Sequence, residues 1–254
     1  MKSWNSLLFL AFFFFLSIID LQAQGRVYDN KGRVLLPVIS IGNFWPAADM
    51  EKRFGRNFEL GLGLEMVSEK NWIIGLDYQF YFGNTVKEDV ISNLRTPDGL
   101  VIGNTRSLAF VELRQRGFYA GGYIGKLIGI IPDNHRSGIR ITVGAGLLQH
   151  KIRIQDDPDS FVPALDDTYK KGYDRLTNGL ALQQFIGYQH LSRNRLINFY
   201  LGLEIIEGFT QNRRSFNFDD RAQDTAKRLD ILYGIKAGWS LPFYLGEKGE
   251  EIFY

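Results

Sequence analysis

An alternation of apolar and polar side chains at every second position constrains the fold of this chain more than any other feature. In residues 58–67 the apolar set begins with Phe58 and Leu60, and the opposite set begins with Glu59 and Gly61. Successive side chains of a β-strand point to opposite faces, so the pattern predicts strands with one apolar face. We expect strands at residues 34–43, 58–67, 72–83, 108–128, 139–147, 176–190, 197–205 and 229–243.

The connections between these segments alternate strictly between short and long. The short ones are residues 68–71, 132–134 and 192–195, and the long ones are 44–57, 84–107, 155–175 and 217–228. Outer-membrane β-barrels have an even number of antiparallel strands, short periplasmic turns and longer external loops. The alternation therefore predicts an all-β fold, a closed eight-stranded antiparallel up-and-down transmembrane β-barrel with both termini on the periplasmic side.

The apolar face of the expected strands is wide and carries aromatic residues near strand ends, among them Trp72, Tyr233 and Trp239. Aromatic girdles at the level of lipid headgroups are typical of membrane barrels. Alternation alone also fits a soluble sandwich or a periplasmic ligand-binding barrel of the lipocalin type. We expect the apolar face to meet lipid.

The N-terminus indicates export. Lys2 precedes an almost unbroken apolar run at residues 7–19, and Ala23 ends a stretch typical of a signal-peptidase site. The run is shorter than the roughly 20 apolar residues of a membrane-spanning helix. We therefore expect a cleaved signal peptide at residues 1–23, a barrel domain at 24–254, and localisation in the cell outer membrane.

Composition excludes several classes of protein. The chain has no cysteine, so it has no disulfide framework and no zinc–thiolate cluster. Its net charge of +2 argues against a dedicated nucleic-acid binder. The three histidines, His135, His150 and His190, show no metal-ligand spacing, and we expect neither a metal site nor a cofactor.

The polar face is expected to fill the barrel. An eight-stranded barrel is just wide enough for side chains to fill its interior, and buried charges need partners. The alternation predicts an interior charge network that includes Glu59, Glu65, Asp77, Glu112, Arg114, Arg116, Lys126, Arg140, Glu204, Asp230 and Lys236. The alternative is a narrow channel, with an ion pathway lined by Glu112, Arg114 and Arg116.

We expect a protein that is not an enzyme. No Gly-x-Ser-x-Gly elbow occurs, and the neighbours of His150 supply neither a nucleophile nor an orienting acid. The alternative is an enzyme active at the outer rim, with a site built on His150 at the external end of its strand.

The external loops are the expected functional surface. They combine charged and aromatic residues, and the candidate partner surface is Tyr169, Lys170, Lys171, Tyr173, Arg213 and Arg214. Such a surface suits docking of an envelope protein complex or of lipopolysaccharide phosphates, in addition to the surrounding outer-membrane lipid. The alternative is loop charge that only interacts with solvent.

Several features of the sequence are shared with a known group of proteins: Ala23 and Gln24 at the signal end, the glycine–aromatic strand pattern, and residues 49–55, 238–244 and 252–254. In these features the sequence resembles the small outer-membrane β-barrel proteins of Bacteroidota, a group that includes PorT-like barrels and is similar to OmpA/OmpX-like eight-stranded barrels. The resemblance implies a non-catalytic interaction platform or an accessory to an envelope process such as protein secretion or gliding. The sequence departs from the pattern of this group in one respect. Such barrels commonly end within the last strand, whereas about ten residues follow the last expected strand here.

Overall fold

The computed structural model describes residues 32–104, 107–156, 162–193 and 195–245. The expected signal peptide, residues 1–23, lies outside the described residues. Eight long strands form the wall of the molecule, and they confirm the eight predicted strands. They are β1 (Arg33–Ala48), β2 (Asn57–Val67), β3 (Trp72–Gly83), β6 (Val111–Ile131), β7 (Asn134–Asp156), β8 (Thr177–Leu191), β9 (Asn198–Asn212) and β10 (Lys227–Ser240).

The wall closes on itself. Each long strand pairs antiparallel with the next one along the chain, and β10 pairs with β1. This seam runs from Val38 opposite Ser240 to Ala48 opposite Asp230, and the short strand β11 (Phe243–Leu245) continues along the other part of β1. A closed ring has no strand edge with unpaired backbone N–H and C=O groups. Lipid tails could not supply hydrogen-bond partners for such groups. The predicted eight-stranded up-and-down barrel is confirmed.

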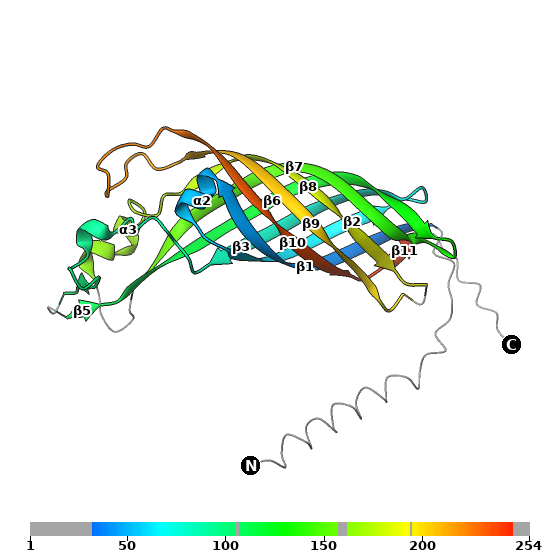
Figure 1. Ribbon diagram of the computed structural model, residues 1–254, viewed down its shortest axis with the longest axis horizontal. Coiled ribbons are helices and arrows are strands. Elements are labelled where there is room, and N and C mark those ends of the chain that lie inside the picture. Colours follow the sequence, from blue (N-terminus) through cyan, green and yellow to red (C-terminus); the bar gives the residue numbers. More distant parts are fainter. Residues whose placement is uncertain (1–31, 105–106, 157–161, 194, 246–254) are drawn as a thin grey trace, which may run out of the picture.

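The long connections gather at one end of the barrel, the loop end, and the short turns lie at the other, the turn end (Figure 1). Both ends of the described chain lie at the turn end. The long connections contain short elements: α2 (Asp49–Arg53), η2 (Ser92–Leu94), β4 (Val101–Ile102), β5 (Leu108–Ala109), η3 (Pro163–Leu165) and α3 (Asp167–Lys170). Strands β6 and β7 have 21 and 23 residues and extend beyond their neighbours toward the loop end.

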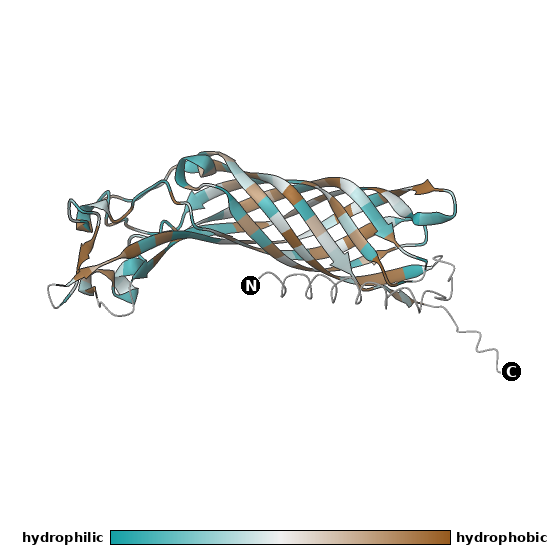
Figure 2. Cartoon of the chain, turned by 60° about the horizontal axis from the view of Figure 1, so that its bottom comes forward, coloured by the Kyte–Doolittle hydropathy of each residue, from teal (hydrophilic) through white to brown (hydrophobic). Residues whose placement is uncertain are grey.

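Large apolar side chains cover the outside of the wall. In Figure 2, hydrophobic and hydrophilic residues alternate along the strands. Leu62 on β2, Leu76 on β3 and Ile235 on β10 are 61%, 66% and 49% exposed, respectively. Aromatic residues lie toward both ends: Trp45 stacks on Tyr233 near the loop end, with ring centroids 6.2 Å apart. No helix in the described part of the chain is long and apolar enough to cross a membrane.

Inside the barrel, two apolar clusters lie at the two ends, with charged side chains between them. The loop-end cluster includes Phe44, Phe54 and Tyr81, and the turn-end cluster includes Leu36 and Val67. Glycines on the inner face make room for aromatic rings, because a side chain at Gly75 would overlap Tyr123 and one at Gly238 would overlap Tyr200. The inner glycines thus allow large rings to fill a narrow interior.

Candidate functional site

The middle of the barrel contains a charge network centred on Lys236. Its Nζ donates hydrogen bonds to Oδ2 of Asp77 at 2.9 Å and to Oε1 of Glu204 at 3.2 Å. The side-chain amides of Gln79 and Gln183 donate to the same two oxygens. Desolvation of these charges is offset because each has an opposite partner and additional hydrogen bonds.

A second ion pair lies toward the turn end. Nη2 of Arg140 is 2.6 Å from Oε2 of Glu65, and both side chains are buried. The Arg140 guanidinium carbon also lies 4.5 Å from the ring centroid of Tyr200, so the cation rests on an aromatic face. On β2, Glu59 accepts a hydrogen bond from Ser40 at 2.8 Å.

Seven of the eleven residues expected in the interior network point into the barrel and are buried: Glu59, Glu65, Asp77, Arg140, Glu204, Asp230 and Lys236. The expected inward position of the other four, Glu112, Arg114, Arg116 and Lys126 on β6, is wrong. The inner positions of β6 are held by Gln115, Tyr119 and Leu127, so the even-numbered side chains between them face outward.

The described interior is packed rather than open. The cavity beside Lys236, Arg140 and Glu204 has a volume of about 10 Å³, no more than one water-sized sphere occupies. The residues proposed to line an ion pathway are on the outside of β6. This arrangement favours a filled barrel over a channel.

His150 lies inside the barrel below the loops instead of at an exposed rim. Its Nε2 is 2.8 Å from Oδ2 of Asp230, which also accepts a hydrogen bond from the Thr210 hydroxyl at 2.5 Å. The ring of Phe54 covers it edge-on, with centroids 5.5 Å apart. Both His150 and Asp230 are buried, so the pair ties β7 to β10 across the interior and has no open approach for a substrate.

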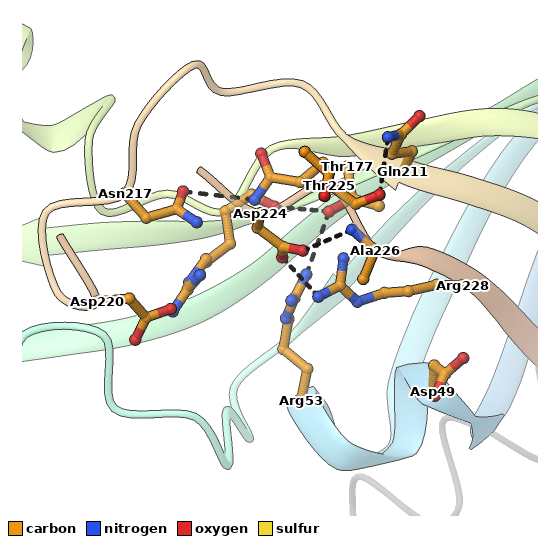
Figure 3. Close-up of polar contacts among 12 residues, drawn as sticks. Asp49, Arg53, Thr177, Gln211, Asn217, Asp220, Asp224, Thr225, Ala226 and Arg228 are labelled. Carbon is orange, nitrogen blue, oxygen red and sulfur yellow. Dashed lines mark hydrogen bonds and ion pairs between the residues drawn. The ribbon is translucent and has the colours of Figure 1, made fainter. Parts of the chain in front are cut away.

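Two buried arginines, Arg53 and Arg175, hold the long loops together over the barrel mouth. Figure 3 shows Arg53 beside Thr177. Arg53, at the end of α2, lies 2.6 Å from Oε2 of Glu88 and donates to Thr177 at 3.2 Å. Arg175, in the β7–β8 connection, lies 3.3 Å from Oε1 of the same Glu88 and 2.5 Å from Asp219 in the β9–β10 connection. All four long connections therefore share one ion-pair network.

The β7–β8 and β9–β10 connections also pack on each other through aromatic contacts. Phe218 contacts Tyr173 edge-on at 5.4 Å between centroids, and its ring occupies the space beside Gly172. Arg214 binds both carboxylate oxygens of Asp174, at 2.8 and 2.6 Å, and this hydrogen bonding raises the pKa of Arg214.

The base of the β9–β10 connection has its own ion pair. Arg228 donates to Oδ2 of Asp224 at 2.5 Å, and the backbone N–H of Ala226 donates to the other carboxylate oxygen (Figure 3). Burial raises the pKa of Asp224, but these two hydrogen bonds and the positive charges of Arg228 and Arg175 together leave the pKa below its ordinary value. The loop end is therefore preorganised by charge pairs.

The six residues of the expected partner surface divide into two groups. Tyr169, Lys171 and Arg213 are exposed, whereas Tyr173 is buried beneath Phe218. Lys170 is 2.8 Å from Asp156. Arg214, as above, is bound to Asp174. Half of this set therefore holds the loops in place and half faces solvent.

A cleft of about 660 Å³ opens at the loop end between β7 and α3. Lys170, Lys171 and Arg214 from the expected surface line it together with Lys151 and Arg153 of β7. The last two were not among the residues predicted from the sequence, although continuation of the β7 alternation beyond Leu147 places both on the outer face. The cleft thus has cations from both walls.

Among the residues that the structure describes, no group of three or more His, Cys, Asp or Glu side chains is arranged to hold a metal ion. The sequence also matches no protein-family model and no curated protein.

Solved structures that this chain matches include Ail, the attachment invasion locus protein of Yersinia pestis, at 11% identity and a TM-score of 0.41. The match covers 83% of this chain and 99% of Ail. A second Ail structure, in complex with the heparin analogue sucrose octasulfate, matches at 9% identity, with the same coverage and a TM-score of 0.39. The N-terminal β-barrel domain of Pseudomonas aeruginosa OprF matches at 11% identity over 83% of this chain and 98% of that domain, with a TM-score of 0.35.

Proposed function

We propose that this chain is an integral outer-membrane protein of a Gram-negative bacterium whose barrel is a sealed scaffold and whose loop end is a non-catalytic interaction platform. In this role it serves as an accessory to an envelope process such as protein secretion or gliding. Its partners are outer-membrane lipid, lipopolysaccharide and an envelope protein complex.

The observation that carries the proposal is the inversion of the usual burial pattern. Outward positions on the eight strands are occupied mainly by Leu, Ile, Phe, Tyr and Trp, while Glu, Asp, Lys and Arg are buried within the ring. In water, an apolar outer surface of this size would be a severe aggregation liability, whereas lipid tails stabilise it. A soluble barrel of the lipocalin type would instead place the apolar side chains inside and the charged side chains on the outer surface.

The loop end supports the platform role. The Glu88 ion pairs of Arg53 and Arg175 join loops that are distant in sequence, which reduces the ordering cost of binding a partner. Tyr169, Lys171 and Arg213 remain exposed on this ordered surface.

The test combines cell fractionation with photo-crosslinking. The full chain expressed in a Gram-negative host should enter the outer-membrane fraction, resist extraction without detergent, and show no conductance in planar bilayers. A photo-crosslinker at Tyr169 should give a defined adduct in native membranes, and Lys171→Glu with Arg213→Glu should abolish it. The control position is the exposed Glu69 at the turn end.

Three results would refute the proposal. Recovery in the soluble fraction would remove the membrane assignment, and steady conductance would indicate a channel. Equal adducts from the Tyr169 and Glu69 positions would show that the loop end is not a binding platform.

A further inference from the structure

Four cations lie together on the outer face of the hairpin formed by β6 and β7. In the register of these two strands, Arg114 is directly opposite Arg153 and Arg116 is directly opposite Lys151. Side chains directly opposite each other on antiparallel strands have Cβ atoms only about 5 Å apart. We call these four residues the outer cationic patch.

The patch has little negative charge to balance it. Arg114 is 2.5 Å from Oε2 of Glu112, the next outward residue on the same strand. Arg116 donates to its neighbour's backbone carbonyl, and across the described ranges no carboxylate forms an ion pair with Arg116, Lys151 or Arg153. Like charges facing each other across a strand pair are destabilising, so the arrangement favours an anion that binds between them.

The level of the patch on the wall identifies the kind of anion. On its other side, Arg116 is paired with Phe82 of β3, and Phe82 contacts Phe58 of β2 at 5.2 Å between centroids. The next outward residue of β6 toward the turn end is Phe118. The patch therefore borders the lipid-facing apolar band at the height of the aromatic side chains, where phosphates of lipid headgroups are found.

The cleft between β7 and α3 extends from the patch toward the loop end. It is lined by Lys151 and Arg153 on one wall and by Lys171 on the other. Lys170 and Arg214 also line it, but their charges are balanced by three carboxylates of the lining, Asp156, Asp167 and Asp174. Its volume of about 660 Å³ is sufficient for several sugar rings.

We propose that the outer cationic patch binds the phosphate groups of a phosphorylated glycolipid of the outer leaflet. Its acyl chains lie against the apolar band beside Phe82 and Phe118, and its saccharide enters the cleft above. Guanidinium groups suit this role because they bind phosphate oxygens in pairs. This inference rests on the proposed membrane location and adds a specific lipid site on the wall, which shares only Lys171 with the exposed loop residues.

The test measures binding of purified lipid A carrying two phosphates to the mature barrel in phosphatidylcholine nanodiscs. The patch variant is Arg116→Gln, Lys151→Gln and Arg153→Gln. The matched control removes three exposed cations at the turn end by Arg33→Gln, Lys70→Gln and Arg193→Gln. Heat-modifiable migration on gels reports folding of each protein, and Lys151→Gln alone serves if the triple variant does not fold.

The wild type and the control variant should bind equally, and the patch variant should bind at least about tenfold more weakly because it loses charge-assisted hydrogen bonds. Lys151→Gln alone should weaken binding about threefold by the same reasoning. Lipid A with its phosphates removed should show the same loss with the wild type. The soluble polyanion inositol hexakisphosphate should not displace lipid A.

Each failure has a distinct meaning. If the wild-type chain does not enter nanodiscs, the proposed function fails and this site fails with it. If it enters and the patch and control variants bind lipid A equally, the site alone is wrong. Displacement by the soluble polyanion would show that the patch recognises a soluble anion instead of a membrane glycolipid.

Discussion

Replacement of Lys236 by methionine tests whether the interior charge network stabilises the barrel. Lys236 is 2% exposed and contacts the carboxylates of Asp77 and Glu204 at 2.9 and 3.2 Å. Methionine has nearly the same length and fills the same space, so the main change is the loss of the positive charge. Two carboxylates would then remain buried beside each other without the ammonium group.

Removing one partner of a buried ion pair costs about 3–5 kcal/mol, because the remaining charge has no compensation. We expect Lys236→Met to lower the free energy of unfolding by this amount. The measurement is urea unfolding of the barrel in detergent or lipid, followed by tryptophan fluorescence and by the gel mobility of the folded form. The control is Lys227→Met, which removes an exposed lysine from the same strand and should cost less than about 0.5 kcal/mol.

Neutralising the carboxylates provides a second check. Adding Asp77→Asn and Glu204→Gln to Lys236→Met removes the uncompensated charge and should restore a large part of the stability. A loss below about 1 kcal/mol for Lys236→Met, or no recovery in the triple variant, would refute the reasoning.

Three further predictions concern the wall and the loops. Glu207 is half-buried on the outer face of β9 between Ile205 and Phe209. Glu207→Leu should raise the unfolding free energy in lipid by about 1 kcal/mol. A lower unfolding free energy would contradict the assignment of this face to lipid. Phe218→Ala removes the ring that packs on Tyr173, so trypsin should cleave residues 213–226 at least about fivefold faster. An unchanged cleavage rate would show that this contact does not order the loop. The folded-state pKa of Asp224 lies below its ordinary value of 3.8, so the contact with Arg228 stabilises the loop above that pH and is lost as the pH falls through the folded pKa. Titration of the Asp224 carboxyl carbon by NMR should show this low midpoint, and Arg228→Gln should raise it; equal midpoints would exclude the ion pair as the cause.

The barrel wall could be predicted because apolar and polar side chains alternate along most of its strands, so that each face is marked by its own kind of side chain. In β2 and β3, leucine and aromatic residues mark the outer face while Glu65, Asp77 and Gln79 mark the inner one. The inward face of β6 was predicted wrongly because its inner positions hold glycines such as Gly117 and Gly121 and uncharged side chains such as Tyr119, so no charge marks that face. Its charged residues therefore looked like the polar, inward set.

The loop end could not be predicted from local patterns. Arg53 reaches Glu88 across 35 residues of sequence and Thr177 across 124. Neither the turn residues nor the charge runs specify such pairs, because they depend on how the barrel brings the loop bases together. The burial of Tyr173 beneath Phe218 has the same origin.

The most direct test of the account is the depth of Leu62 in a bilayer. This outward residue near the middle of β2 is replaced by tryptophan in a barrel produced without residues 1–23, which contain Trp4, and with Trp45, Trp72 and Trp239 changed to phenylalanine. We predict strong fluorescence quenching by lipids brominated deep in their acyl chains and little quenching by acrylamide in the water. Quenching by acrylamide without quenching by brominated lipid would contradict the claim that the apolar face of this barrel meets lipid.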